Sequence, residues 1–271
     1  MNFNKIIGND NIKKELKDIV HSYIFQGTEG IGKILFAKTF AEEILCENNN
    51  SCGSCKSCIM FNSDNHPDFM IINLEETIIK IEEIRELIKK VIEKPIISTH
   101  KVYIINVDAQ NCLLKTLEEP PEYMTIILIA SNENLLLPTI KSRCTKISFN
   151  KLLKEDMKKY IELKKIEDLD EDFIDLCNGS IKRLEKIIVN KDRYNEIKNL
   201  FKEVEKRNKL DFYILGKDLF VKENIQDILE YSINVIYNLR LKNKKLLECI
   251  SVVQNAINKI NSNCNFDMCI D

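Results

Sequence analysis

The chain of 271 residues has few glycines and prolines, no long hydrophobic run and no excess charge of one sign. No apolar run approaches the roughly 20 residues of a membrane-spanning helix, and residues 1–5 lack the apolar core of a signal peptide. We therefore expect a cytoplasmic protein. The 40 basic and 42 acidic residues give a net charge of −2, which argues against binding of nucleic acid through overall charge. A hydrophobic content of 44% can form a sizeable core, and the length predicts two or three domains.

Three of the 7 glycines lie together in a stretch that is typical of a phosphate-binding P-loop. An apolar run at 22–26 leads into Gly27, Gly30, Gly32 and Lys33, and a helical pattern over 32–45 follows. In such a loop the backbone N–H groups and the helix N-terminus face phosphate oxygens, and the lysine adds a positive charge. The alternative is a glycine-rich turn that only connects a strand to a helix.

The position after Lys33 departs from the P-loop pattern. Ile34 stands where the motif has serine or threonine, so the hydroxyl that would bind Mg²⁺ is missing. We therefore expect P-loop ancestry without ATP hydrolysis. Whether the loop binds ATP stays open at this point.

Ten cysteines are present, and four of them lie within residues 46–58, namely Cys46, Cys52, Cys55 and Cys58. Because tetrahedral Zn²⁺ takes four thiolates, the spacing predicts a closed structural zinc site. The alternative is a group of free thiols that contains a redox pair. The nearby His66 is a less favoured ligand, since a loop histidine beside proline is more often a cap or a surface residue. The other six are scattered and are expected to be thiols in a reducing compartment: Cys112, Cys144, Cys177, Cys249, Cys264 and Cys269.

Short apolar strands alternate with helical patterns as far as residue 149. Strands are predicted at 22–26, 68–73, 101–106, 124–130 and 145–149, and helices at 9–20, 32–45 and 81–92. This alternation indicates βαβ units and a parallel sheet buried on both faces. The sequence predicts a doubly wound α/β domain over residues 1–149.

Beyond residue 149 the sequence shows only helical patterns. Those at 154–165, 169–177 and 181–190 predict a small helical unit over 150–192. Those at 193–206, 224–241 and 244–260 predict a separate all-α domain over 193–271, which we expect to be truncated at its C-terminus.

Several motifs in the first 150 residues resemble the clamp-loader branch of the AAA+ ATPases, whose bacterial members are subunits of DNA polymerase III. They are the segment 21–27 (His-Ser-Tyr-Ile-Phe-Gln-Gly), the four-cysteine insert, Asn65-His66-Pro67-Asp68, the segment 113–121 (Leu-Leu-Lys-Thr-Leu-Glu-Glu-Pro-Pro) and the segment 137–144 (Leu-Pro-Thr-Ile-Lys-Ser-Arg-Cys). The resemblance implies an AAA+ P-loop domain, a helical lid over 150–192 and a helical collar over 193–271 that mediates oligomerisation.

The resemblance also assigns a role to one arginine. Ser142-Arg143-Cys144 matches the arginine-finger motif of the family, in which the guanidinium reaches the γ-phosphate of ATP held by a neighbouring subunit. There it would stabilise the charge of the transition state in trans. The alternative is an arginine that binds carboxylates of its own domain.

Two further pairs lie at sensor positions of the family. Ser131 and Asn132 match the first sensor, with a purely structural role as an equal alternative. Lys182 and Arg183 lie where a second sensor would be, although a surface charge pair is the favoured interpretation.

The sequence departs from active family members at several loops. An active member has an acidic cluster after its third strand, whereas residues 106–110 (Asn-Val-Asp-Ala-Gln) run directly into the next helix. The chain is also short near 20–21 and between Cys46 and Cys52. We expect loop residues to be missing from the sequence at these three places.

The resemblance therefore implies a subunit without ATP hydrolysis of its own in a hetero-oligomeric ring. Its partners would be ATP-hydrolysing motor subunits and the clamp-opening subunit, and through the complex the sliding clamp and primed DNA. One alternative is an autonomous ATP-hydrolysing loader subunit or DNA-dependent motor, which ATP turnover by the chain alone would indicate. Another is a zinc-dependent nucleic-acid-binding module, which salt-sensitive DNA binding would indicate.

Overall fold

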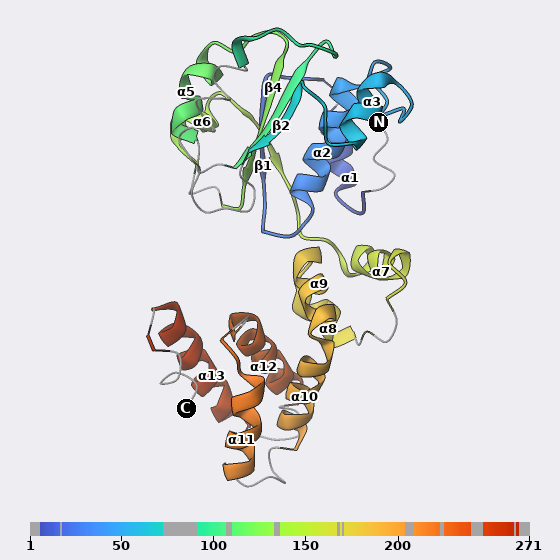
Figure 1. Ribbon diagram of the computed structural model, residues 1–271. Coiled ribbons are helices and arrows are strands. Elements are labelled where there is room, and N and C mark those ends of the chain that lie inside the picture. The colour runs from blue at the N-terminus through green and yellow to red at the C-terminus, as the bar shows by residue number, and fades with distance from the viewer. Residues whose placement is uncertain are drawn as a thin grey trace. The chain divides into compact units, whose positions relative to one another are not determined.

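The computed structural model describes residues 6–16, 18–72, 91–106, 110–132, 136–166, 169, 171–203, 209–222, 225–239, 246–262 and 264–265 (Figure 1). The chain divides into two compact units, residues 1–182 and residues 183–271. This division falls inside a helix, and the predicted domains 1–149, 150–192 and 193–271 stay a prediction. None of the helices in the described ranges combines the length and the hydropathy needed to cross a membrane.

The first unit is built on a five-stranded sheet. Its strands are β1 (Ser22–Gln26), β2 (Phe69–Ile72), β3 (Lys101–Asn106), β4 (Met124–Ala130) and β5 (Thr145–Ser148), in the order β2-β3-β4-β1-β5. All neighbouring strands are parallel. The predicted strands and the parallel α/β fold are confirmed, with ends that differ by one residue at most.

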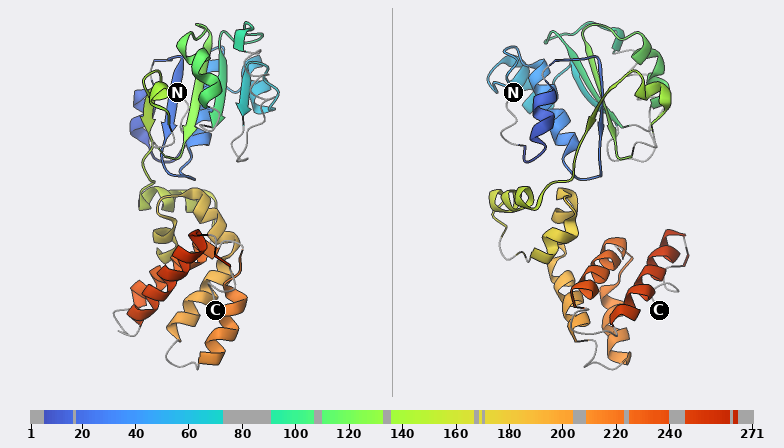
Figure 2. Two further views of the ribbon diagram at one scale, coloured as in Figure 1. Left: turned by 90° about the vertical axis from the view of Figure 1, so that its left-hand side faces the viewer. Right: turned by 180° about the vertical axis from the view of Figure 1, so that it is seen from behind.

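Helices cover both faces of this sheet, as Figures 1 and 2 show. One face carries α1 (Asp10–Glu15), α2 (Lys33–Leu45) and α3 (Lys56–Asn62), and the other carries α5 (Gln110–Glu118) and α6 (Pro138–Lys141). Along β1, Tyr23 and Phe25 belong to the core with α2, whereas Ile24 belongs to the core with α5 and α6. The two-residue period of a strand thus divides one apolar run between two cores.

Aromatic side chains hold α2 against β1. The ring centroids of Tyr23 and Phe40 lie 5.4 Å apart at an interplanar angle of 85°, and those of Phe25 and Phe36 lie 6.1 Å apart at 80°. Edge-to-face pairs of this kind stabilise a core beyond the area that they bury. They also fix the distance between β1 and α2, and therefore the course of the glycine loop between them.

The first helix is shorter than the sequence pattern over 9–20 predicts. It ends at Glu15, and the backbone beyond it binds a tyrosine of β1. The Val20 N–H donates to Tyr23 Oη (3.0 Å), and Tyr23 Oη donates to the Asp18 carbonyl (2.7 Å). These backbone groups are therefore not used in a helix. The predicted helix over 81–92 lies mostly in residues 73–90, which are outside the described part of the chain.

Every element after β5 in the described residues is a helix, as predicted. The shorter predicted helices correspond to α7 (Lys154–Leu163), α8 (Glu171–Cys177) and α9 (Ile181–Val189), and the longer ones to α10 (Lys191–Lys202), α12 (Ile225–Leu239) and α13 (Leu246–Asn261). In the second unit α10 packs on α12 through the buried rings of Tyr194 and Tyr231, whose centroids are 4.9 Å apart. The sequence pattern does not predict α11 (Lys209–Leu219), because its apolar residues run together and Gly216 interrupts the helical period.

A buried carboxylate joins the start of β2 to the chain that enters β3. Asp68 is 1% exposed and accepts hydrogen bonds from the backbone N–H groups of Ile96 (2.7 Å), Ile97 (2.8 Å) and Ser98 (2.9 Å). A buried charged group is tolerated only with partners of this quality. Asp68 therefore fixes the loop before β3.

We predict that Asp68→Asn destabilises the first unit. The amide offers a single acceptor oxygen, so at least one of the three N–H groups faces an amide nitrogen, at a cost of about 2–3 kcal/mol. Urea denaturation followed by circular dichroism should show a lower midpoint. The matched control is Asp64→Asn, which changes an exposed aspartate with a φ of 55° that asparagine accepts readily. Equal midpoints for the two variants would contradict the assignment.

Candidate functional site

The glycine loop connects β1 to α2 at the carboxyl edge of the sheet. Gly27 follows β1, and its N–H donates to the carbonyl of Ala130 at the end of β4 (3.2 Å). Gly32 precedes α2 with a φ of 91°, and Lys33 is the first residue of that helix. The predicted order of strand, glycine loop and helix is confirmed. That Gly27, Gly30, Gly32 and Lys33 bind nucleotide is not tested and stays a prediction.

The ammonium group of Lys33 binds its own loop. Lys33 is 6% exposed, and its Nζ donates to the carbonyls of Gly27 (2.5 Å) and Thr28 (2.7 Å). Burial lowers the pKa of this ammonium group to about 8, and the Glu29 carboxylate offsets part of the effect. Lys33 therefore has acceptors inside the loop and is not extended toward an outside anion.

The tip of the loop is bonded to the start of α9. The backbone N–H groups of Ile181 (2.8 Å) and Lys182 (3.3 Å) donate to the Gly30 carbonyl, and Ser180 Oγ donates to the Glu29 carbonyl (3.1 Å). Lys182 Nζ donates to Glu29 Oε1 (2.5 Å). At Gly30, whose φ is 79°, an added Cβ would lie 2.2 Å from Ser180 Oγ and 2.6 Å from Lys182 Cβ. This close contact requires glycine at position 30.

Two groups that metal-assisted hydrolysis needs are expected from the sequence to be absent, namely the hydroxyl after Lys33 and the acidic cluster after the third strand. The side chain of Ile34 is partly buried and packs against the core on the α2 side, so it contributes no polar atom to the loop. The place of the acidic cluster falls on residues 107–109, which are outside the described part of the chain.

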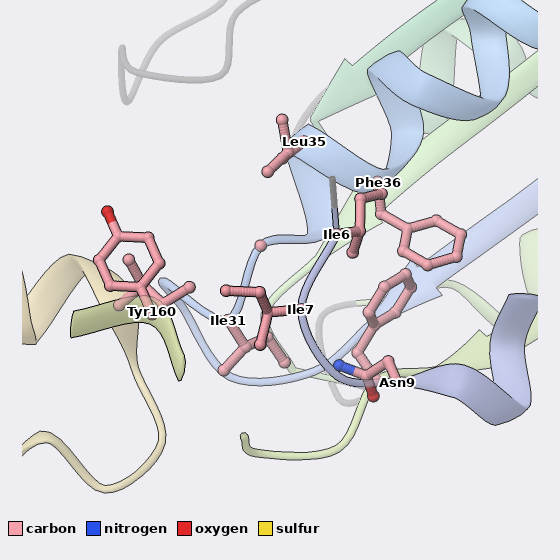
Figure 3. Close-up of a pocket in the computed structure, with 10 residues that line it drawn as sticks. Ile6, Ile7, Asn9, Ile31, Leu35, Phe36 and Tyr160 are labelled. Carbon is pink, nitrogen blue, oxygen red and sulfur yellow. The ribbon is translucent and has the colours of Figure 1, made fainter. Parts of the chain in front are cut away.

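A small cavity lies beside the loop (Figure 3). Apolar side chains line it from the segment before α1 (Ile6 and Ile7), from the loop and α2 (Ile31 and Phe36) and from α7 (Tyr160). Its volume is about 50 Å³, whereas ligand pockets usually measure about 300–1,000 Å³.

The two pairs at sensor positions have different surroundings. Residues 131–132 follow β4 directly, beside the loop, and both are exposed. Lys182 pairs with Glu29, and Arg183 pairs with Glu230 of α12 (3.0 Å), all with exposed side chains. These contacts agree with the favoured interpretation of Lys182 and Arg183 as surface charges.

Arg143 follows α6 and lies just before β5. Its carbonyl accepts a hydrogen bond from Ser22 Oγ at the start of β1 (2.7 Å). Its Nη2 donates to Glu118 Oε1 (3.0 Å), and its Nη1 donates to the Thr139 carbonyl (2.9 Å) and to Ser142 Oγ (3.4 Å). The side chain is 34% exposed. The chain by itself thus shows the alternative contact, a carboxylate of the same domain, and the role of Arg143 in trans stays a prediction.

The four cysteines predicted as metal ligands come together after α2. The Sγ atoms of Cys46, Cys52, Cys55 and Cys58 all lie within 4.8 Å of one another, and those of Cys46 and Cys55 are 4.0 Å apart. Four thiolates bound tetrahedrally to Zn²⁺ at about 2.3 Å are separated by about 3.8 Å, which is close to this arrangement. The residues present between Cys46 and Cys52 are therefore enough to close the cluster.

Backbone N–H groups stabilise the sulfur atoms. The N–H of Cys52 donates to Cys46 Sγ (3.5 Å), that of Cys55 to Cys52 Sγ (3.3 Å) and that of Cys58 to Cys55 Sγ (3.4 Å). Hydrogen bonds from Ser54 lower the pKa of the Cys52 thiol to about 5, whereas burial raises the pKa of the Cys58 thiol. Donors aimed at sulfur orient thiolate ligands, so the cluster fits a metal ion.

His66 does not join the cysteine cluster. It is 5% exposed, and its Nε2 lies 2.9 Å from Ser57 Oγ and 3.3 Å from Ser98 Oγ, while its Nδ1 accepts the N–H of Asp68 (3.1 Å). His66 is therefore not a surface residue, whereas the N–H that its Nδ1 accepts agrees with the alternative expectation of a cap. Both serine hydroxyls also donate to the carbonyl of Leu45, so the histidine belongs to a buried polar network under the cysteine loop.

Comparisons with known proteins agree with this fold and these motifs. The family model described as "DNA polymerase III, delta subunit" matches residues 9–153. DNA polymerase III subunit delta' of Pseudomonas aeruginosa is 36% identical over 135 residues, which are 46% of this chain and only 41% of that relative. DNA polymerase III subunit gamma of Buchnera aphidicola subsp. Schizaphis graminum is 30% identical over 249 residues, which are 82% of this chain and 68% of that relative.

A solved structure shows a similar fold. The crystal structure of a DNA polymerase III gamma subunit-related protein from Thermotoga maritima has a TM-score of 0.53 at 19% identity, over 96% of this chain and 95% of that chain. The glycine loop, the cysteine cluster and Arg143 all lie inside the segment 9–153 that the family model matches, and this segment is more than half of the chain. The chain therefore belongs to the DNA polymerase III delta-subunit family, as a delta-prime-like member of the AAA+ clamp loaders.

Proposed function

We propose that this chain is a clamp-loader subunit of DNA polymerase III that does not hydrolyse ATP and gives Arg143 to ATP bound by a neighbouring subunit. It acts with ATP-hydrolysing motor subunits and the clamp-opening subunit, and through the complex it helps to load the sliding clamp onto primed DNA during replication. The observation that carries this proposal is the internal bonding of the glycine loop.

In that arrangement neither the lysine of the loop nor its tip is offered to a phosphate. Lys33 Nζ binds two carbonyls of the loop, and the Gly30 carbonyl binds the start of α9. Ile34 offers no hydroxyl for Mg²⁺, which phosphoryl transfer in P-loop enzymes requires. These features support a subunit whose own loop is structural.

Arg143 has the properties that a contribution in trans requires. Its backbone is tied to β1 through Ser22, while its side chain remains one-third exposed beyond α6. A guanidinium held in place in this way adds positive charge at a developing transition state without further reorganisation.

An exposed apolar face in the second unit supports assembly with other subunits. On α11 the side chains of Leu210, Tyr213 and Ile214 are 66%, 45% and 53% exposed, at a spacing that places them on one side of the helix. Contiguous exposed apolar groups mark interaction surfaces. We assign this face to packing of the helical collar against sister subunits.

We also propose that the ion held by the four cysteines is Zn²⁺ in a structural role. Four thiolates complete its coordination and leave no open position for catalysis. The site then supports the insert between α2 and β2 and the buried network of His66 below it.

The first prediction from this proposed function concerns Arg143→Ala in the reconstituted loader with clamp and primed DNA. Turnover at the neighbouring ATP site should fall by about 10³-fold, because the finger stabilises the transition state, while assembly stays intact. Steady-state ATP hydrolysis and size-exclusion chromatography measure the two properties. Lys141→Ala is the matched control, since it removes an exposed positive charge two residues away. Unchanged turnover with Arg143→Ala would leave this chain as a scaffold.

A second prediction separates this function from that of an autonomous ATPase. Lys33→Met should leave turnover of the assembled loader unchanged, because Lys33 binds its own loop, and the isolated chain should show no ATP hydrolysis. The control is the same substitution in the P-loop of a motor subunit, which should abolish turnover. ATP hydrolysis by the isolated chain that Lys33→Met removes would instead establish the alternative, an ATP-hydrolysing subunit.

A third prediction concerns zinc. Purified chain should contain zinc in stoichiometric amount, and chelation should increase proteolysis within residues 45–65, because metal binding and local folding are coupled. Cys58→Ser should lower the zinc content and increase this proteolysis without a chelator. Cys264→Ser, which changes an exposed thiol outside the cluster, should leave both the zinc content and the proteolysis unchanged. Unchanged proteolysis after complete removal of the metal would show that the insert folds without it.

A further inference from the structure

Among the described residues, Glu118 is the one residue from a distant segment whose side chain binds the Arg143 guanidinium. The other two acceptors, the Thr139 carbonyl and Ser142 Oγ, lie within four residues of Arg143. Glu118 is 25 residues away in sequence, and its Oε1 accepts from Nη2 at 3.0 Å. The orientation of the guanidinium relative to the sheet is therefore set by this carboxylate.

Glu118 is carried by a helix that is packed firmly against the sheet. Glu118 is the last residue of α5, which lies next to α6 on one face of the sheet (Figure 1). Leu113 and Leu117 of the same helix are buried in the sheet core, at 0% and 5% exposure. Since α5 cannot shift without disturbing these contacts, packing fixes the backbone from which the Glu118 side chain extends.

The guanidinium keeps hydrogen-bond donors after these contacts are made. Arginine has five N–H donors, and the contacts of Arg143 within the described residues use both donors of Nη1 and one of Nη2. Within the described part of the chain, Nε and the second N–H of Nη2 have no acceptor and are available to an outside one. Two such donors on one planar group suit the oxygens of a phosphate.

The exposure of this ion pair indicates that it contributes little to the stability of the fold. The side chains of Arg143 and Glu118 are 34% and 51% exposed. Ion pairs as exposed as this one add little to fold stability. Removal of Glu118 should therefore leave the fold intact, so that an effect on ATP turnover can be separated from an effect on folding.

We propose that Glu118 is a positioning residue for Arg143, which holds the guanidinium so that its two remaining donors face the γ-phosphate of ATP in the neighbouring subunit. This inference rests on the proposed function of Arg143. Glu118 itself does not touch ATP and acts only through the arginine.

A double-mutant cycle in the reconstituted loader tests this role. Glu118→Ala should lower kcat for ATP hydrolysis at the neighbouring site by about 10- to 100-fold, since a misplacement of about 1 Å costs about 10²-fold. The KM for ATP should not change, because binding of the nucleotide belongs to the neighbouring subunit. Glu118→Gln, which keeps an acceptor oxygen, should restore part of kcat. In the Arg143→Ala background, Glu118→Ala should have no further effect.

Glu119→Ala is the matched control, because it removes an adjacent and exposed carboxylate from the same turn and should leave kcat unchanged. Size-exclusion chromatography of each complex excludes a loss of assembly. An unchanged kcat with Glu118→Ala, while Arg143→Ala lowers it, overturns this inference and leaves the proposed function intact. An equal loss in the presence and absence of Arg143 also overturns it. An unchanged kcat with Arg143→Ala overturns the proposed function itself.

Discussion

Burial of β1 on both faces is the constraint on which the glycine loop and Arg143 both depend. Its central residues Tyr23, Ile24 and Phe25 are almost fully buried, and the strand pairs with β4 on one side and β5 on the other. Ser22, at its start, holds the carbonyl of Arg143, and Gly27, after its end, opens the glycine loop. A slip of one residue would exchange the two faces of the strand and move both ends. The packing of a single strand therefore positions the loop and the arginine together.

Most of the fold could be predicted from the sequence, because strands buried on both faces appear as short apolar runs and helices as a regular period. The cysteine cluster was also predictable, since its ligands are close in sequence. Contacts that join distant segments were not. His66 binds Ser98 over 32 residues, and Ser180 binds the carbonyl of Glu29 over 151 residues. Residue types at such separations give no local signal, so the burial of His66 and the bonding of the loop tip could be found only in three dimensions.

Three basic side chains of the first unit differ in whether they can bind a phosphate beyond their present contacts. Lys33 is buried, and it would have to leave two carbonyls inside a closed loop before it could reach a phosphate. Lys182 lies at the loop but is paired with Glu29. Arg143, in contrast, remains accessible, and among the described residues it keeps donors after it has bound Glu118 and Thr139. The number of donors that remain, rather than the count of positive charges, distinguishes a cation that serves the fold from one that can serve a neighbour.

The close contact at Gly30 shows that a glycine can match a nucleotide-binding motif for a purely structural reason. The position satisfies the glycine pattern of a P-loop, yet the structure requires glycine there because Ser180 and Lys182 leave no room for a side chain. Selection for this packing alone would keep a glycine at position 30, whether or not the loop binds nucleotide. The chemistry of the loop has to be judged from where the lysine and the loop carbonyls point.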